Sequence, residues 1–402
     1  MTRILFVITS SENLGDLALC REWISDLGRS RYQFGFVLHR DLRRYIDQAD
    51  TLFFYEYYIH VKDRILEAYR DFEPAAVIFA SNSFWNLPGY FGAEFGRFIL
   101  EPGDVDVPVL SFDPFEIGIE YTMHQTNNTV YFSPVPSWVW ALRYMSTSPR
   151  SSNAMHFALR QQAFNETPAF RNDVITKWGG DPRHPTIFFP VSLNRWQFIK
   201  QHYPLYYEHL SGIFEELGED LQIFILSPNE VIEFTHLRRV IQLPLLDYQD
   251  FHDLVAAADL YLTDSYISCI FNAFILGTPA VLLCNSEASR SLAEGSFLED
   301  EFFPFRVFPY GLNDACDQLE AVWGTEGCYG QIEILDVDAV VAGIRDVLSE
   351  GQLYQSMIEN IRQWQKDHQH LPNPGMALEA ILKQHRERSP REPNGISEVK
   401  LS

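Results

Sequence analysis

Two kinds of polar turn in this sequence contain side chains suited to catalysis or to anion binding, and the first kind occurs near the N-terminus. Asp16 ends a polar turn that follows the apolar run Ile4–Ile8. A carboxylate between a strand and a helix is placed to remove a proton from an attacking hydroxyl or amine, as a general base. The alternative is structural: Asp16 caps the following helix and Gly15 allows the turn.

The second kind of turn follows two apolar runs in the second half of the chain, Thr186–Pro190 and Leu260–Leu262. Hydroxyl, amide and guanidinium groups gather in these turns: Ser192, Asn194, Arg195, Ser265 and Ser268. The start of a helix offers unpaired N–H groups and about half a positive charge, which suits a diphosphate. The guanidinium of Arg195 could add positive charge to such a site. The alternatives are that the serines only cap helices and that Arg195 is a surface residue.

Metal-binding patterns are weak in this chain. Asp104 and Asp106, and again Asp336 and Asp338, have the D-x-D spacing that can hold a divalent ion for a nucleotide-sugar diphosphate. The first pair also fits a turn before a strand, and Asp336 fits a helix N-cap. The sequence contains no phosphate-binding loop, dinucleotide-binding or nucleophile-elbow motif. We therefore expect no metal and no resident cofactor.

The composition argues against several classes of partner. The 402 residues include 31 Lys and Arg against 54 Asp and Glu, a formal net charge of −23. Nucleic-acid binding and polybasic membrane binding need clustered positive charge, so neither is expected. No segment reaches the ~20 apolar residues of a membrane span, and the N-terminal run is too short for a signal peptide. Five scattered cysteines fit a reducing, cytoplasmic environment.

Apolar runs and helical periodicity alternate along most of the chain, which predicts α/β domains with parallel sheets. The expected strands are Ile4–Ile8, Phe34–Leu38, Ala75–Ala80, Val107–Leu110, Thr186–Pro190, Gln222–Leu226, Val240–Leu243, Leu260–Leu262 and Ala280–Leu283. The expected helices are Leu17–Leu27, Leu205–Leu217, Asp250–Ala258, Ser268–Leu276, Asp338–Leu348 and Leu353–Lys366. Residues 120–176 are less regular and are expected to hold late helices of a first domain and a linker.

These elements predict two Rossmann-like domains that face each other across a cleft. We place the first domain at residues 1–178 and the second at residues 179–366. A C-terminal helix at residues 367–386 and a disordered tail at residues 387–402 follow. The C-terminal helices are expected to return to the first domain.

The stretch from residue 245 to residue 283 resembles the donor half of the GT-B fold glycosyltransferases. The resemblance rests on Ala257-Ala258-Asp259-Leu260 and on Leu276-Gly277-Thr278-Pro279-Ala280, which frame a strand, a small turn and a helix. It implies that the second domain binds a nucleotide-sugar, with the turns described above on the diphosphate and the backbone of Leu243–Leu246 on the nucleobase. Where relatives of the muramoyl-pentapeptide GlcNAc transferase have a ribose-binding Glu, this chain has Asn272, and the double-glycine turn is missing.

The N-terminal turn, Asn13-Leu14-Gly15-Asp16, is similar to the N-x-G-D turn of bacterial protein-arginine rhamnosyltransferases, which are also GT-B and metal-independent. That resemblance implies that the first domain binds the acceptor and that Asp16 is the general base of an inverting transfer. Polysaccharide pyruvyl transferases also have such a turn.

The GT-B resemblance also implies roles for two further residues of the second domain. By position in the fold, Asn272 would bind the ribose and Glu287 the donor sugar.

Together these observations predict a metal-independent glycosyltransferase that moves a sugar from a nucleotide-sugar to an unidentified acceptor, which could be a peptide, a protein or a small molecule. Two alternatives stay open. One is a nucleotide-sugar epimerase or a pyruvyl-type transferase on the same fold. The other is a non-catalytic GT-B-like binding or regulatory protein, which the missing ribose Glu and double-glycine turn would explain.

Overall fold

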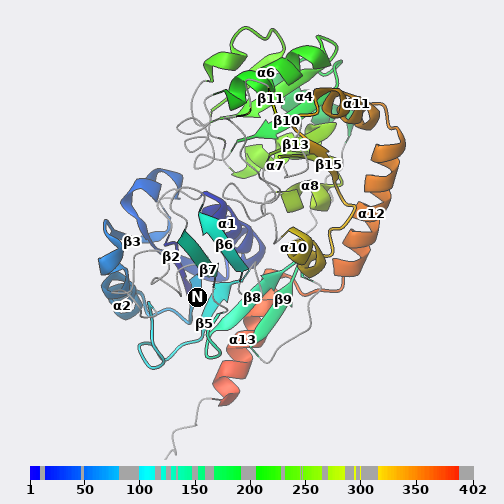
Figure 1. The fold of residues 1–402 in the computed structure, drawn as a ribbon. Coiled ribbons are helices and arrows are strands. Elements are labelled where there is room, and N and C mark those ends of the chain that lie inside the picture. The colour runs from blue at the N-terminus through cyan, green and yellow to red at the C-terminus, as the bar shows by residue number, and fades with distance from the viewer. Residues whose placement is uncertain are drawn as a thin grey trace, which may run out of the picture.

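The structure is a computed structural model. It describes residues 1–9, 14–46, 49–80, 99–113, 119–123, 128–132, 135–146, 153–158, 167–191, 205–227, 231–244, 246, 248–264, 270–285, 294–295, 299 and 316–388. Within these residues, two parallel sheets with helices on their faces make two lobes, one above the other in Figure 1. This architecture confirms the predicted pair of Rossmann-like domains.

The first sheet has the strand order β3-β2-β1-β4-β5-β8-β9, and every neighbouring pair is parallel. Its strands are β1 (Thr2–Val7), β2 (Tyr32–His39), β3 (Thr51–Tyr55), β4 (Ala76–Phe79), β5 (Val109–Phe112), β8 (Trp140–Tyr144) and β9 (Ala154–Phe157). β1 is buried on both faces, which is why it is a continuous apolar run. Ile4 and Phe6 pack on the same side as helix α1 (Leu14–Leu27), whereas Leu5 packs on the side of helix α2 (Val61–Phe72).

The second sheet has the strand order β12-β11-β10-β13-β14-β15, again parallel throughout. Its strands are β10 (Thr186–Pro190), β11 (Gln222–Leu226), β12 (Val240–Leu243), β13 (Leu260–Thr263), β14 (Ala280–Cys284) and β15 (Gly330–Glu333). Helices α6 (Tyr206–Leu217) and α11 (Val337–Leu348) share a core with one face. Helices α7 (Tyr248–Ala257) and α8 (Ile270–Leu276) share a core with the other face, and α4 (Pro168–Lys177) packs against α7.

The last helices connect the two domains. Helix α10 (Cys316–Trp323) precedes β15, and α12 (Gln352–His368) runs along one side of the molecule from the second domain toward the first (Figure 1). Helix α13 (Pro374–Arg388) then packs against α1 and β9. The backbone N–H of Gly375 donates to Asp26 Oδ2 at 2.8 Å, and Arg31 Nη2 lies 2.5 Å from Glu379 Oε1. The C-terminal helices therefore return to the first domain, as the sequence predicts.

The expectation of late helices and a linker over residues 120–176 is wrong for much of that segment. Strands β6 (Ile119–Met123) and β7 (Asn128–Phe132) form an antiparallel pair, and β8 and β9 extend the first sheet. β8 is only five residues long and β9 only four. Their identity as strands depends on pairing with β5, which lies earlier in the chain, so the local pattern does not show it.

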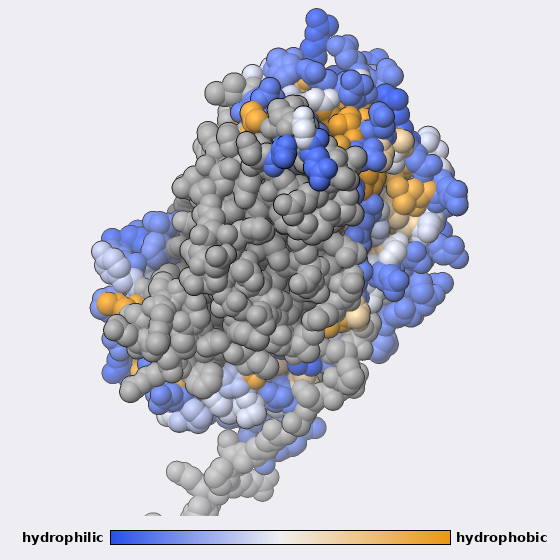
Figure 2. All heavy atoms as spheres, viewed as in Figure 1, coloured by the Kyte–Doolittle hydropathy of each residue, from blue (hydrophilic) through white to orange (hydrophobic). Residues whose placement is uncertain are grey.

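The chain has a formal net charge of −23. On the face drawn in Figure 2, most coloured atoms are hydrophilic and the apolar ones form small groups. Among the described residues, no helix combines the length and the apolarity needed to cross a bilayer.

Candidate functional site

Each sheet has a point at which the order of its strands reverses, and the predicted site residues follow the strands at these points. β1 lies between β2 and β4 in the first sheet, and β10 lies between β11 and β13 in the second. Glu287 is the exception among the predicted residues, since it follows β14. In open α/β sheets, ligands bind beyond the carboxyl ends of the strands at such a switch point. The topology therefore selects the turns that follow β1, β10 and β13, which are the three turns that the sequence singles out.

Asp16 lies directly beyond the switch point of the first sheet. Helix α1 begins at Leu14, so Asp16 is inside the first helical turn and is not the capping residue before it. Asp16 keeps some solvent contact, yet burial raises the pKa of its carboxyl from 3.8 to about 7. A carboxyl with a pKa near neutrality can accept a proton and release it again at physiological pH, which a general base requires.

Two polar side chains near Asp16 in the sequence, Thr9 and Cys20, are buried. Cys20, one turn further along α1, is fully buried, and burial together with the nearby Asp16 raises the pKa of its thiol. Thr9, just after β1, is 1 % exposed, and its hydroxyl has no hydrogen-bond partner among the described residues. Buried hydroxyls are usually hydrogen-bonded, so Thr9 offers a polar group to a ligand at this edge.

A buried carboxylate also lies at the switch point of the second sheet. Asp264, directly after β13, is 3 % exposed, and its Oδ2 accepts a hydrogen bond from the Tyr206 hydroxyl at 2.7 Å. Tyr206 is the first residue of α6, so this bond fixes the chain where it leaves β13. Sequence reasoning missed both Thr9 and Asp264. The signal was available, because each is a polar residue directly after a buried strand.

Asn272 lies in α8, which follows the turn after β13. It is 8 % exposed, and its side-chain amide has no hydrogen-bond partner among the described residues. An amide in such a position is available for a hydroxyl of a ligand. The ribose contact predicted for Asn272 stays a prediction.

The other predicted site residues lie outside the described residues: Ser192, Asn194, Arg195, Ser265, Ser268 and Glu287. The strands that lead to two of their turns are described. β10 and β13 are neighbours, with Ile187 paired to Leu260 and Phe188 paired to Tyr261. The two turns expected to hold a diphosphate therefore begin side by side. Leu243, expected near the nucleobase, ends β12 and is buried.

Asp259, in the phrase that carries the family resemblance, has a structural role. Its Oδ2 accepts a hydrogen bond from the Thr186 backbone N–H at 2.7 Å and another from Arg171 Nη2 at 2.6 Å. Arg171, in α4, also donates to the Pro182 carbonyl at 2.7 Å. Asp259 thus joins the beginnings of β10 and β13 to α4, at the end of the sheet opposite to the switch-point turns.

In both D-x-D pairs, side-chain carboxylates have structural partners. Asp104 Oδ2 accepts from the Glu101 N–H at 2.7 Å and pairs with Lys62 Nζ at 2.7 Å. Asp106 accepts a hydrogen bond from the Tyr69 hydroxyl. Asp336 is the N-cap of α11, since its Oδ1 accepts from the Ala339 N–H at 3.0 Å. In the described part of the chain, no group of three or more His, Cys, Asp or Glu side chains is placed to hold a metal ion.

The two domains touch close to Asp16. Glu22 Oε1, on α1, lies 3.6 Å from His252 Nε2, on α7, and each side chain is 13 % exposed. Glu22 follows Asp16 by six residues, or about 9 Å along the helix. Helix α1, which carries Asp16 in its first turn, therefore forms part of the junction between the domains.

Comparison with solved structures gives matches over nearly the whole chain. The glycosyltransferase VinC, in complex with dTDP, has a TM-score of 0.58 at 12 % identity and covers 96 % of this chain and 100 % of its own. The calicheamicin glycosyltransferase CalG4 has a TM-score of 0.55 at 12 % identity, covering 97 % and 100 %. A structure described as a UDP-N-acetylglucosamine 2-epimerase from Listeria monocytogenes has a TM-score of 0.51 at 12 % identity, covering 98 % and 100 %. At these identities the likeness establishes the fold, which is GT-B.

Sequence comparison adds a family but no activity. No curated protein sequence matches the chain. A family described as "Family of unknown function (DUF6365)" matches residues 24–388. Because this match includes most of both domains, the chain belongs to the DUF6365 family, and it has the GT-B fold.

Proposed function

We propose that this protein is a metal-independent glycosyltransferase that transfers a sugar from a nucleotide-sugar to an acceptor, with Asp16 as the general base. The observation that carries the proposal is the Asp16 carboxyl: it lies at the switch point of the first sheet, and burial raises its pKa to about 7. The GT-B fold and the contact between Glu22 and His252 support it, because they bring the two ligand-binding edges toward one junction.

In the proposed reaction, the acceptor's hydroxyl or amine attacks the anomeric carbon as Asp16 takes its proton. The new bond forms between the acceptor and the anomeric carbon, and the bond from that carbon to the diphosphate oxygen breaks with inversion. The nucleoside diphosphate leaves with the electron pair. Arg195, Ser192, Asn194, Ser265 and Ser268 would hold its charge, with Asn272 on the ribose and Glu287 on the sugar.

The donor can be identified by binding measurements. We expect one of UDP, GDP or dTDP to raise the melting temperature of the protein, with the same shift in EDTA, because a ligand that binds only the folded chain stabilises it. dTDP is included because VinC was solved with it. Arg195→Gln should weaken that binding at least tenfold. Absence of binding by all three at millimolar concentration would favour the non-catalytic alternative.

The catalytic role can then be separated from binding. Turnover of the donor nucleotide-sugar, with water or with an acceptor, should fall by about 10²–10⁴ in Asp16→Asn while nucleotide binding is kept. Asp41→Asn is the matched control, since that side chain is 77 % exposed in the same domain. Equal turnover in wild type and Asp16→Asn would rule out the proposed base.

A nucleotide-sugar epimerase is the second candidate, because the Listeria structure shares the fold. NMR of the donor alone separates the two. An epimerase converts the sugar of the nucleotide-sugar with no acceptor present and keeps the nucleotide attached or releases an epimerised sugar. A transferase leaves the configuration of the intact donor unchanged.

A further inference from the structure

The first domain has a hollow beside α1, at the connection between β2 and β3. β1, α1 and β2 make a right-handed crossover that places α1 on one face of the sheet. Between β2 and β3, the described residues form only the 3₁₀ turn η1 (Arg40–Tyr45). The opposite face of β2 and β3 is covered by α2. Beside α1, the described residues of the β2–β3 connection that lie next to these strands are η1 and the residues just after it.

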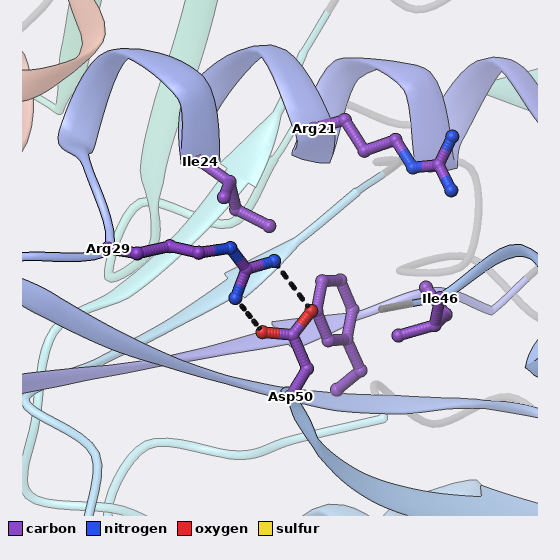
Figure 3. A pocket seen from close by; sticks show the side chains of 6 residues that line it. Arg21, Ile24, Arg29, Ile46 and Asp50 are labelled. Carbon is purple, nitrogen blue, oxygen red and sulfur yellow. Dashed lines mark hydrogen bonds and ion pairs between the residues drawn. The ribbon is translucent and has the colours of Figure 1, made fainter. Parts of the chain in front are cut away.

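This hollow contains a cavity of about 200 Å³ beneath α1 (Figure 3). Ile24, Phe36 and Ile46 give it apolar walls, and Arg21, Arg29 and Asp50 supply its polar groups. Sites for drug-sized ligands are usually ~300–1,000 Å³. A ligand of this cavity would therefore be small, and the mixed walls favour one with an apolar body and a polar end.

Two of the three charges in the cavity neutralise each other. Arg29 Nη1 and Nη2 donate to the two carboxylate oxygens of Asp50 at 2.5 and 3.0 Å, the paired geometry drawn in Figure 3. The Asp50 side chain is 3 % exposed, so its charge is held almost out of water. A buried carboxylate with a bidentate guanidinium partner has no need of a further cation.

Among the described residues, Arg21 has no carboxylate partner of this kind. Its guanidinium donates to the Tyr45 carbonyl, and no carboxylate lies within ion-pair distance of it among the described residues. In Figure 3 it stands apart from the Arg29–Asp50 pair. A guanidinium has five N–H donors, and one carbonyl leaves most of them unused. The cavity thus keeps one unmatched positive charge in a chain whose net charge is −23.

We propose that this cavity binds a small organic monoanion, a single carboxylate on an apolar body the size of a phenyl ring or a short alkyl chain. The carboxylate binds the guanidinium of Arg21, which matches it in charge and geometry. The apolar body lies against Ile24, Phe36 and Ile46. Arg29 and Asp50 precede β2 and β3 and so lie at the amino ends of these strands, whereas Asp16 follows the carboxyl end of β1. Arg21 lies on α1, five residues after Asp16.

The test uses the full chain and four probes: benzoate and hexanoate, with benzamide and hexanamide as neutral counterparts. Saturation-transfer NMR and calorimetry should show both carboxylates binding and the amides at least tenfold weaker. Arg21→Gln should reduce carboxylate binding at least tenfold and leave the amides unchanged. The matched control is Arg183→Gln in the second domain, a guanidinium that is 84 % exposed and pairs with Asp181. It should bind all four probes as wild type does.

A second variant keeps the test valid if Arg21→Gln folds poorly. Ile46→Trp fills the cavity and should abolish binding of both carboxylates. Unchanged benzoate binding in Ile46→Trp or in folded Arg21→Gln would overturn the proposal. So would a wild-type protein that binds neither carboxylate at concentrations on the order of 10 mM. Nucleotide binding by the second domain is a separate readout, so failure here leaves the glycosyltransferase proposal standing, and the reverse also holds.

Discussion

At the scale of single residues, the position of Asp16 should cost the protein stability. Its carboxyl pKa is about 7 in the folded chain against 3.8 in the unfolded one. Between pH 3.8 and about 7, the Asp16 carboxyl therefore keeps its proton in the folded state and has lost it in the unfolded state. The stability linked to the protonated carboxyl is complete below pH 3.8 and is lost as pH rises through about 7.

We therefore expect Asp16→Asn to stabilise the protein at pH 8 by about 2 kcal/mol, given ~1.4 kcal/mol per unit of pKa shift and a reduction for partial solvent contact. The gain should be clearly smaller at pH 5. Urea unfolding of wild type and variant at both pH values checks this. A variant less stable than wild type at pH 8 would mean that the ionised carboxyl is well solvated or paired, and the argument for an active carboxyl would weaken.

Some properties of this site could be predicted from the sequence and others could not. The place of Asp16 after β1 depends on the elements next to it, so the local pattern was sufficient. The raised pKa depends on burial by segments distant in the sequence, which no local pattern contains. Asp259 is a different case. The segment Ala257-Ala258-Asp259-Leu260 correctly indicated the fold, but the Asp259 carboxylate accepts hydrogen bonds from Thr186 and Arg171 and so has a structural role.

At the scale of elements, buried strands were the easiest to predict. β10 and β11 have the expected bounds, because strands covered on both faces are read from apolar side chains in sequence. β12, a half-buried strand at the edge of the sheet, also has the expected bounds. Helices such as α1 start a few residues from the expected position, since capping and packing decide helix ends. β8 and β9 were missed because short strands are identified by their neighbours in the sheet.

The Asp259 contacts allow a prediction at this scale. Asp259→Ala leaves the Thr186 N–H and the Arg171 guanidinium without their shared acceptor, which should lower the free energy of unfolding by about 2 kcal/mol. Asp259→Asn keeps an acceptor oxygen and should lose about half as much. Urea unfolding measures both variants. Asp259→Ala as stable as wild type would show that these bonds add nothing to the junction of α4, β10 and β13.

At the scale of the whole molecule, the two domains share one apolar core. A single cluster of buried side chains includes Phe6 from the first sheet and Phe188 from the second. α12 and α13 continue it, with Trp364 and Leu378 as members. The chain thus begins in the first domain, builds the second, and returns to complete the core of the first. This connection predicts that the domains unfold together, although many two-domain proteins unfold in separate steps.

Leu378 in α13 tests this coupling, since it is fully buried in the shared core. Leu378→Ala should lower the free energy of unfolding by about 3 kcal/mol, through lost burial and the cavity left behind. Met376→Ala is the matched control on the same helix, because Met376 is 61 % exposed and its loss should cost no more than ~0.5 kcal/mol. Tryptophan fluorescence and far-ultraviolet circular dichroism should give one coincident transition that shifts as a whole in Leu378→Ala. If only part of the signal shifts, so that two transitions separate, then α13 stabilises the first domain alone, and the shared core does not couple the two halves of the molecule.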